Sequence, residues 1–448
     1  MRKTINLKKG LNLRIEGALA DTNVSATVIP ANIAIVPDDF PGFMPKPDVK
    51  EGDSVKAGSA LMHDKNAPDI HLVSPISGTV ESVVRGARRK IERIVIKTDT
   101  ASPSTVATMT STAITSADDV RRMLKSSGLW AMMRRRPYDI VPMESDRPRD
   151  IFVTALDTAP LALNLEEMVK GMDAQIAKGV EAMTKLTDGT IYICVAQGSN
   201  LADVKGAEMI ELPMLHPAGN AGVQIANIKP VNKGEVVWTL DIVTLAKLGE
   251  AILNGKIDYS VETALTGSEV ITPKVVKTVP GAQLGELLAG DEKTDGRNHR
   301  VISGNVLTGT PEGEAGYLRY PYRQVTVIPE GDDTHEFMGW ASLSPSKMSE
   351  SRSFLGRFLG RKFNPDARIN GGRRAMIMSG IYDDYMPMDI LPEPLIKAII
   401  AKDIDKMEAL GIYEVAPEDF ALAEYADPSK LELQRIVRQG LDYMRNEA

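Results

Sequence analysis

The stretch VKEGDSVKAG (Val49–Gly58), followed after a gap by SPISGTV (Ser74–Val80), sets the character of the N-terminal part of the chain. Short runs of β-prone residues recur around it, and glycine and proline interrupt them before a helical period can develop. Gly52, Gly58 and Gly78 stand where tight turns need a residue that accepts a positive φ. The pattern predicts a small β-barrel or β-sandwich over residues 1–105.

The same stretch resembles the biotinyl and lipoyl carrier modules, in which it precedes a hairpin whose tip lysine carries the cofactor. Here the expected tip reads KNAPD (Lys65–Asp69), and its lysine is offset from the centre of the turn. A carrier lysine has to project into solvent from the middle of a tight turn. We therefore expect a carrier-like domain without biotin or lipoate. The alternative, a modified Lys65, would increase the intact mass of the chain.

Composition excludes several classes of protein. A chain of 448 residues corresponds to three or four domains of ordinary size, and its net charge of −7 does not favour bulk binding of nucleic acid. Cys194 is the single cysteine, so this chain alone cannot supply the four thiolates of a typical iron–sulfur cluster. The five histidines are dispersed, His63 and His71 being the nearest pair, and we expect no metal site.

The N-terminus has a basic start but no apolar segment of the kind found in signal peptides. No run of about 18 apolar residues occurs anywhere in the sequence. We therefore expect neither a signal peptide nor a transmembrane segment.

Residues 106–257 change character after a Ser/Thr/Ala-rich stretch over 99–119 that has the composition of a linker. Strand-like runs alternate with helix-length segments at a spacing of roughly thirty residues, which is typical of a parallel sheet with crossover helices. The expected strands fall at 150–158, 189–197, 207–213 and 235–242, and the helices near 117–127, 164–185, 220–227 and 242–254. The pattern predicts a Rossmann-like α/β domain.

Two further regions complete the predicted α/β multidomain chain. Residues 258–345 read strand, strand, short helix, strand, an α+β order that is consistent with a β-grasp domain. Residues 346–448 hold a basic segment and then a helical C-terminal region, in which prolines stand at helix starts and Gly411 stands near a stop.

The stretch SGLWAMMRRRPYDIVP (Ser127–Pro142) enters the α/β domain where a mononucleotide site would need a glycine-rich turn. The tryptophan and methionines are explained by core packing, and the arginines by a solvated or partner-facing strip. A third hypothesis is an aromatic, cationic lining that binds a flat ligand such as a quinone. Its candidate residues are Trp130, Met132, Met133, Arg134, Arg135, Arg136, Pro137 and Tyr138.

The stretch LHPAGNAG (Leu215–Gly222) reads as the entry to a helix, whose first amides could bind an anion. His216 is either a further ligand contact or a hydrogen-bonded structural residue. No residue is assigned as a catalytic acid or base.

The basic run over residues 351–374 interleaves cations with three phenylalanines, and in the sequence only Asp366 opposes them. It is either a solvated face or a surface that docks on an acidic protein or on lipid headgroups. The docking candidates are Arg352, Arg357, Arg361, Lys362, Arg373 and Arg374.

Taken in order, these stretches resemble the A subunit of the bacterial sodium-translocating NADH:quinone reductase across nearly the whole chain. The resemblance rests on LKKGLNLRIEG, VKEGDSVKAG, RGARRKIERIVI, SGLWAMMRRRPYDIVP, IFVTALDTAPLA, HPAGNAG, RVISGNVLTGT and SRSFLGRF. That family is in turn similar to the C subunit of the Rnf complex and to the flavoprotein subunit of complex I, which bind flavin and iron–sulfur clusters.

This chain departs from those relatives at the positions that would bind their cofactors. GLWAMMRRRP replaces their glycine-rich flavin loop, and in ALDTAP Asp157 remains while Ala159 stands in place of the second acid. LAEYADPSK (Leu422–Lys430) has no cysteine. The departures argue against flavin, NADH and an iron–sulfur cluster in this chain, and an independent nicotinamide dehydrogenase would need the missing loop.

The resemblance implies a peripheral subunit on the cytoplasmic face of the bacterial inner membrane. It would dock on an integral membrane subunit of the complex, while the flavins, the iron–sulfur cluster and the sodium path belong to other subunits. It would either contribute to the quinone site or act as a purely structural cap.

Overall fold

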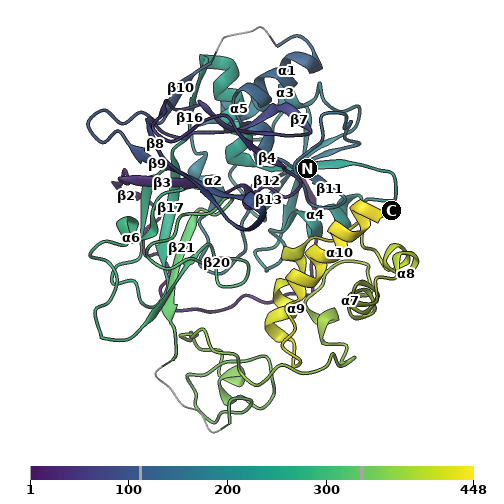
Figure 1. Cartoon of the computed structure of the whole chain (residues 1–448). Coiled ribbons are helices and arrows are strands. Elements are labelled where there is room, and N and C mark those ends of the chain that lie inside the picture. Colours follow the sequence, from purple (N-terminus) through teal and green to yellow (C-terminus); the bar gives the residue numbers. More distant parts are fainter. Residues whose placement is uncertain (1, 110–113, 333–337, 448) are drawn as a thin grey trace.

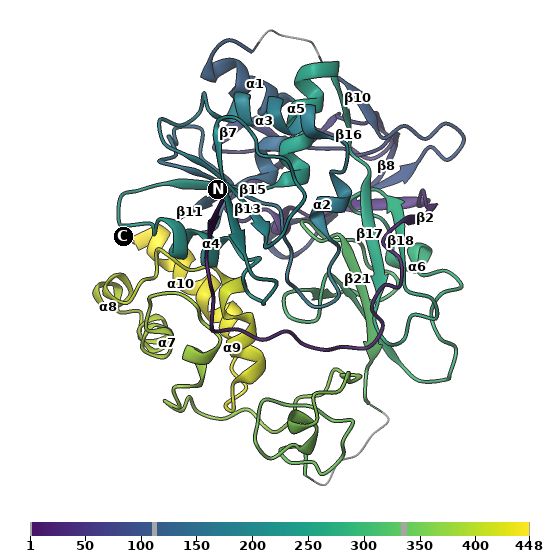
Figure 2. The ribbon, with the colours of Figure 1, turned by 180° about the vertical axis from the view of Figure 1, so that it is seen from behind.

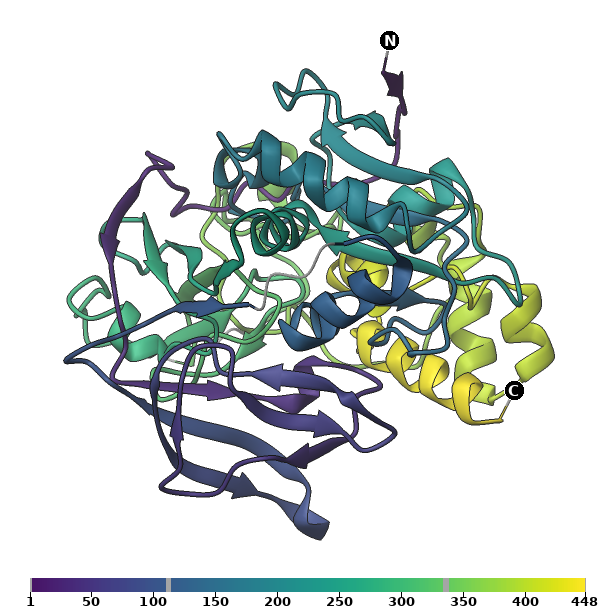
Figure 3. The ribbon, with the colours of Figure 1, turned by 90° about the horizontal axis from the view of Figure 1, so that it is seen from above.

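A computed structural model describes residues 2–109, 114–332 and 338–447 of the chain (Figure 1). His335 and part of the predicted linker, residues 110–113, lie outside the described residues. The N-terminal sheets and the C-terminal helices lie on different sides of a central sheet, as the view from above shows (Figure 3).

The carrier-like region forms two small sheets. One has the order β3 (Asn32–Ile35), β9 (Ile91–Thr98), β8 (Gly78–Arg85) and β5 (Ser54–Val55); the other has the order β4 (Pro45–Pro47), β6 (Ala60–Asp64) and β7 (Ala67–Val73). Ile33, Leu61 and Ile94 are fully buried between them. Alternating apolar residues on short strands therefore build one shared core.

The tip of the β6–β7 hairpin differs from the prediction. It is a two-residue turn of Lys65 and Asn66, because the backbone N–H of Asn66 donates to the Asp64 carboxylate at 2.7 Å and closes the turn early. Lys65 is exposed and stands in the turn itself, so the expected offset of the lysine is wrong. That Lys65 carries no cofactor stays a prediction.

The first residues of the chain join other sheets. β1 (Lys3–Thr4) pairs in parallel with β14 (Ala207–Leu212), and β2 (Val24–Thr27) pairs in parallel with β18 (Lys274–Thr278). Residues 3–4 and 24–27, which were predicted within the N-terminal β domain, therefore complete two other sheets. Strand propensity alone does not indicate which sheet edge a segment will complete.

The central sheet has the order β1-β14-β13-β12-β15-β11. Its members are β14 (Ala207–Leu212), β13 (Ile191–Ala196), β12 (Ile151–Thr154), β15 (Val237–Asp241) and β11 (Arg134–Arg136); β11 runs antiparallel to β15 and the other pairs are parallel. The helices are α1 (Ala117–Ser126), α2 (Leu165–Met168), α3 (Asp173–Met183), α4 (Ala221–Ile228) and α5 (Ile242–Asn254). The predicted parallel sheet with crossover helices is present.

Helices cover both faces of this sheet. Val153 and Ile193 share one core with α3 and α5, whereas Phe152 and Cys194 share another with Ile225 of α4. Both faces are thus buried, which explains the nearly continuous apolar runs of these strands.

Two local predictions for this domain are corrected. The helix expected over 164–185 is broken into α2 and α3 around Gly171, whose φ of +79° is not helical. Within the predicted linker, β10 (Val106–Thr108) pairs antiparallel with β16 (Lys256–Asp258), because the strand that leaves α5 offers it a partner edge.

The third sheet has the order β2-β18-β17-β21-β19-β20. It is built from β17 (Val261–Thr266), β18 (Lys274–Thr278), β21 (Gln324–Pro329), β19 (His299–Ser303) and β20 (Thr310–Pro311), with the short helix α6 (Leu284–Leu287) beside it. The strand, strand, helix, strand order agrees with the sequence, while the β-grasp assignment stays a prediction.

The C-terminal region packs α7 (Pro392–Ala401), α8 (Ile404–Ala409), α9 (Ala421–Ala426) and α10 (Leu433–Glu447) around a core that includes Tyr382 and Phe420. α7 begins at a proline and Gly411 follows α8, as the sequence predicts. Within the described residues, no helix combines the length and the apolar character that crossing a membrane requires.

An extended N-terminal segment, residues 5–17, joins all of these regions (Figure 2). Gly10 N–H donates to Asp384 O at 3.1 Å and Leu11 N–H donates to His216 O at 2.8 Å. Glu16 N–H then donates to Phe363 O at 3.0 Å, and Gly17 O accepts from Gly267 N–H at 3.0 Å. Backbone groups that would otherwise be buried without partners are satisfied in this way.

Gly17 tests the importance of the last of these contacts. It has a φ of +84°, and a Cβ there would lie 2.1 Å from the carbonyl carbon of Gly267. We expect Gly17→Ala to lower the free energy of unfolding by about 2–4 kcal/mol, since it adds backbone strain and a collision. Gly171→Ala is the matched control, because its φ is +79° and nothing lies within 4 Å. Equal losses of stability in the two variants, measured by denaturant unfolding, would show that the contact between Gly17 and Gly267 does not explain the effect.

Candidate functional site

A cavity of about 530 Å³ opens at the carboxyl ends of two adjacent parallel strands. Thr154 at the end of β12 pairs in register with Asp241 at the end of β15, and both line the cavity. In the order of the sheet, β13 and β14 lie on one side of β12, and the later strand β15 lies on its other side. The order of the strands therefore reverses between β12 and β15. Ligands of open α/β sheets bind at such a point, where the strand order reverses.

All four regions of the chain contribute to the wall of this cavity. The first region supplies Asp38 and Asp39, the second Met132, Arg134, Arg136 and His216, the third Tyr320 and Arg323, and the fourth Glu418 and Gln434. The cavity therefore lies between regions rather than within one, as small-molecule sites commonly do.

Strand alternation decides which arginines of β11 face the cavity. Arg134 and Arg136 line it, while Arg135 between them does not. Arg135 instead lies 3.5 Å from the Asp146 carboxylate, with its guanidinium carbon 5.8 Å from the centroid of the Tyr138 ring. Successive side chains of a strand point to opposite faces, so the three arginines cannot act as one strip.

Arg134 stands in an aromatic part of the wall. Its guanidinium carbon lies 5.2 Å from the ring centroid of Tyr320 and 5.8 Å from that of Phe40, and these two rings stack at 4.9 Å. One of its nitrogens donates to the carbonyl oxygen of Asp39 at 2.8 Å. Cation–π contacts and this hydrogen bond hold the charge in place at the cavity.

Arg136 is a buried cation, only 2% exposed, among three carboxylates. It lies 3.1 Å from Glu418, 3.5 Å from Asp139 and 3.7 Å from Asp419. Burial acts to lower the pKa of Arg136, but the three carboxylates outweigh it and raise that pKa. The guanidinium is therefore permanently charged.

Burial raises the pKa of Glu418, and the neighbouring Asp419 adds to the rise while Arg136 opposes it. The Glu418 side chain is 42% exposed where it faces the cavity, so water reduces this effect compared with complete burial. The pKa of Asp419, which is fully buried, is raised by burial in the same way.

His216 is a neutral donor in the wall. Burial lowers its pKa to about 4, so the ring is uncharged at neutral pH. The Thr158 hydroxyl accepts from Gly219 N–H at 2.9 Å and lies 3.1 Å from Nδ1 of His216, so its own proton is available to Nδ1. In the tautomer in which Thr158 donates to Nδ1, the proton lies on Nε2, which is buried and has no hydrogen-bond partner among the described residues.

Two aspartates end the central strands. Asp241 caps α5 through Thr244 N–H at 2.7 Å and accepts from Arg323 at 2.8 Å; these contacts outweigh burial and lower its pKa. Desolvation in the wall and the charge of Asp241 raise the pKa of Asp157, but the residue is exposed, so water reduces this effect. The cavity thus combines fixed cations, a neutral histidine and carboxylates with different proton affinities.

The helix entry at LHPAGNAG forms α4, but its first turn meets a carboxylate of the chain itself. The side chain of Asn220 donates to Asp419 at 3.4 Å, and a Cβ on Gly222 would lie 2.2 Å from that carboxylate. The place where an external anion was expected is therefore filled by Asp419.

The structure separates the candidate ligand residues into two groups. Met132, Arg134, Arg136 and His216 line the cavity, whereas Trp130, Met133, Arg135, Pro137 and Tyr138 do not. Trp130 is fully buried, its ring 5.3 Å from that of Trp238, and its indole N–H donates to Pro142 O at 2.8 Å. Core packing explains Trp130 and Met133.

Other cavity residues were missed in the sequence. Arg323, Tyr320 and Glu418 lie far from the motifs along the chain, and no local pattern points to them. Asp157 and Asp241 could have been found in the sequence, because each follows a leucine at the end of an apolar run, in ALDT and TLDI. Carboxyl ends of neighbouring parallel strands meet at one edge, so the two acids could have been placed together.

The docking candidates lie in a lobe, residues 338–374, that projects from the rest of the molecule (Figures 1 and 2). Arg352, Arg361, Lys362 and Arg374 are exposed, as are Phe358 at 67% and Leu343 at 87%. Arg357 pairs with Glu350 at 3.3 Å and Arg373 with Glu432 at 2.6 Å. Acids outside the run therefore oppose two of the cations in the folded chain: Glu350, which directly precedes the run, and Glu432, which lies far along the sequence.

Three family models match the chain in succession. They are the NqrA N-terminal barrel-sandwich hybrid domain over residues 5–99, the NqrA second alpha/beta domain over 115–257 and the NQRA C-terminal domain over 263–311. A Pasteurella multocida protein, named as the A subunit of a Na(+)-translocating NADH-quinone reductase, is 36% identical over 448 residues, which is 99% of this chain and 100% of that protein. The chain belongs to the NqrA family. The resemblance found in the sequence is thus confirmed.

Other NqrA relatives agree. A Neisseria meningitidis protein of the same name is 35% identical over 455 residues and one from Serratia proteamaculans is 36% identical over 451, each covering 99% of this chain and 100% of the relative. Among solved structures, an NAD+-reducing [NiFe]-hydrogenase in the air-oxidized state aligns with 75% of this chain and 64% of its own, at 13% identity and a TM-score of 0.40.

Arg136→Met should show how strongly this member of the NqrA family depends on its buried cation. Removing the charge leaves Asp419 and Glu418 uncompensated, and we expect a loss of about 3–5 kcal/mol at pH 8. The folded-state pKa values of both acids rise further in the variant, so its stability is lost as pH rises and the deficit is smaller at pH 5. Urea unfolding at the two pH values measures this.

Arg122→Met is the control, because Arg122 is 65% exposed and pairs with Asp119 on the surface at 3.3 Å. It should cost less than about 1 kcal/mol at either pH. A deficit of Arg136→Met that does not change with pH would contradict the electrostatic explanation.

Proposed function

We propose that this chain is a peripheral subunit of a Na(+)-translocating NADH:quinone oxidoreductase on the cytoplasmic face of the bacterial inner membrane, and that its cavity binds the quinone headgroup. The chain carries no redox cofactor of its own. Electrons reach the quinone from the cofactors of partner subunits, while this chain orients the headgroup. Membership of the NqrA family supports the first part, and the cationic cavity at the carboxyl ends of β12 and β15 supports the second.

The chemistry of the wall favours a quinone over a nucleotide. The turn beside β11 carries methionine and arginine side chains where phosphates need bare backbone amides, and Asp419 fills the entry of α4. A quinone has no phosphate, and its flat ring suits an aromatic side chain such as Tyr320, which is supported by the stacked ring of Phe40.

Reduction places negative charge on the quinone oxygens, which gives the polar groups their proposed roles. Arg134 supplies a fixed cation, and the proton on Nε2 of His216 supplies a neutral hydrogen bond to a carbonyl oxygen. Both interactions strengthen as charge develops, so they favour the reduced headgroup over the oxidised one. No group of this chain is assigned as the proton donor.

Arg134→Met and Arg135→Met form a matched pair for testing quinone binding, because only Arg134 faces the cavity. Ubiquinone-1 is titrated into the purified chain by calorimetry, with menadione in parallel. We expect saturable binding that is weakened about tenfold or more in Arg134→Met and unchanged in Arg135→Met, since the lost contact involves a charged group. His216→Phe, which keeps a ring but has no donor, should also weaken binding.

Absence of saturable binding in the wild-type chain would contradict the quinone part and favour a purely structural cap. Equal effects of the two arginine variants would place any bound quinone outside this cavity. The intact complex provides the second readout: Arg134→Met should lower quinone reduction while assembly is retained.

We further propose that the lobe docks this chain on an integral membrane subunit. Its exposed apolar side chains, among them Trp340, Leu343 and Phe358, lie in a segment that also carries Arg352, Arg361 and Lys362. Large exposed apolar groups near cations are typical of interfaces, and such a surface would be costly if it remained in water.

Phe358→Asp should reduce assembly with membranes from a strain in which this subunit is missing. Buried aromatic anchors typically account for much of an interface's affinity, so we expect about tenfold or more weaker cosedimentation. Leu253→Asp is the control, because Leu253 is 46% exposed at the end of α5, far from the lobe in Figures 1 and 2. Equal cosedimentation of wild type and Phe358→Asp would exclude the lobe as the main docking surface.

A further inference from the structure

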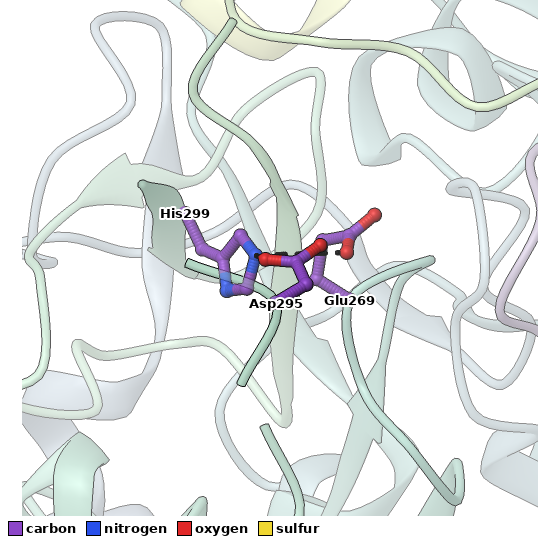
Figure 4. A group of neighbouring side chains, drawn as sticks. All are labelled: Glu269, Asp295 and His299. Atoms are coloured by element: carbon purple, nitrogen blue, oxygen red, sulfur yellow. Dashed lines mark ion pairs between the residues drawn. The ribbon is translucent and has the colours of Figure 1, made fainter. Parts of the chain in front are cut away.

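Three side chains that can bind a metal ion converge at one end of the third sheet: Glu269, Asp295 and His299 (Figure 4). Nε2 of His299 lies 3.2 Å from an Asp295 oxygen and 3.6 Å from Oε2 of Glu269. Glu269 follows β17, His299 begins β19, and Asp295 lies in the loop before it. None of the three lines the cavity described above.

The two buried members have unused polar atoms directed at this point. The side chains of Glu269 and His299 are 1% and 3% exposed. Oε2 of Glu269 and Nε2 of His299 make no hydrogen bond among the residues that the structure describes. Leaving two such atoms buried and unsatisfied is costly, and a bound cation would satisfy both.

Surrounding contacts orient these atoms. Nδ1 of His299 lies 2.7 Å from the carboxylate of Glu292, to which it can donate, and Nε2 then presents its lone pair to the cluster. Oε1 of Glu269 accepts from the Ser268 hydroxyl at 2.9 Å and from the Asn364 amide at 3.3 Å, so that Oε2 is the free oxygen. A carboxylate behind a ligating histidine is the usual second layer of a zinc site.

The spacing suits a small tetrahedral ion. Zinc lies about 2.0–2.2 Å from nitrogen and oxygen ligands, which puts two ligands of a tetrahedron about 3.3 Å apart. The separations of 3.2 and 3.6 Å agree with that edge. One imidazole and two carboxylates are ligands that Zn²⁺ accepts.

We propose that Glu269, Asp295 and His299 bind a divalent transition-metal ion, with Zn²⁺ as the first candidate and water as the fourth ligand. Two cations stand beside the site: Lys293, 3.8 Å from Glu269, and Arg297, 2.6 Å from Asp295. They neutralise part of the acidic charge and so reduce the affinity of the site for the ion. The ion would join the loop before β19 to the turn after β17, a structural role independent of quinone binding.

The test uses the full chain, stripped of metal by a chelator and titrated with ZnCl₂ against a chromophoric competitor at pH 7.5. We expect one tight site whose affinity falls at least tenfold in His299→Gln and in Asp295→Asn. Glu292→Gln should weaken binding about 10- to 100-fold, because Glu292 only orients the histidine. Asp295→Asn alters an exposed loop residue, so it remains informative if His299→Gln fails to fold.

His71→Gln is the control, since His71 and His63 form a cross-strand pair beside Asp48 that could bind zinc weakly. It should leave the tight site unchanged. Loss of the tight site in His71→Gln, or equal zinc affinity in wild type and His299→Gln, would overturn the proposal and leave the cluster as a group of polar side chains without a metal ion. Co²⁺ gives a second readout: the visible bands of tetrahedral cobalt should appear in the wild type and be absent from His299→Gln.

Discussion

The buried guanidinium of Arg136 is the interaction on which the cavity depends. It is the third residue of a short edge strand, yet two of its three carboxylate partners come from the C-terminal region. A buried ion pair contributes little net stability, since desolvation offsets most of the attraction. What the ion pair contributes is geometry. The planar guanidinium fixes β11 relative to Glu418 and Asp419, and Asp419 also contacts Asn220 at the start of α4. The wall of the cavity follows from that arrangement.

The cavity is a property of the assembled chain. The central sheet provides the carboxyl ends of β12 and β15, but the aromatic side chain Tyr320 of the wall comes from the third region and stacks on Phe40 of the first. The fold type alone therefore does not define the ligand; the side chains brought in from the other regions do. A mainly parallel sheet that lacks the glycine-rich turn can keep the location of the usual binding site and change its chemistry.

Features that depend on local periodicity were predicted well. The helices α1, α4 and α5 and the four main strands of the central sheet lie close to their predicted positions, because amphipathic and apolar repeats report directly on burial. Three of the arginines were found together in the sequence, but their alternation across β11 separates Arg135 from the other two. Knowing the strand would have been enough to predict this.

What was missed depends on contacts that are distant in sequence. Glu418 reaches Arg136 across most of the chain, and β1 and β2 complete sheets formed by much later residues. The acid and imidazole of Asp295 and His299 are four positions apart, which is a recognisable spacing, but Glu269 comes from a separate turn. The pattern of a single sequence does not indicate which distant residues come into contact unless the topology is known.

The N-terminal segment has a consequence for how the chain is made. Residues 5–17 are made before the residues that they contact, since Arg14 donates to Gly360, which lies 346 positions later. At the ~5–20 residues per second of protein synthesis, the segment waits some tens of seconds for its partners. The small sheets of the N-terminal region can form meanwhile, since their strands are neighbours in sequence. The segment can contact Gly360 and Phe363 only after they have been made, and a chain truncated before them would leave these backbone groups open to association with other molecules.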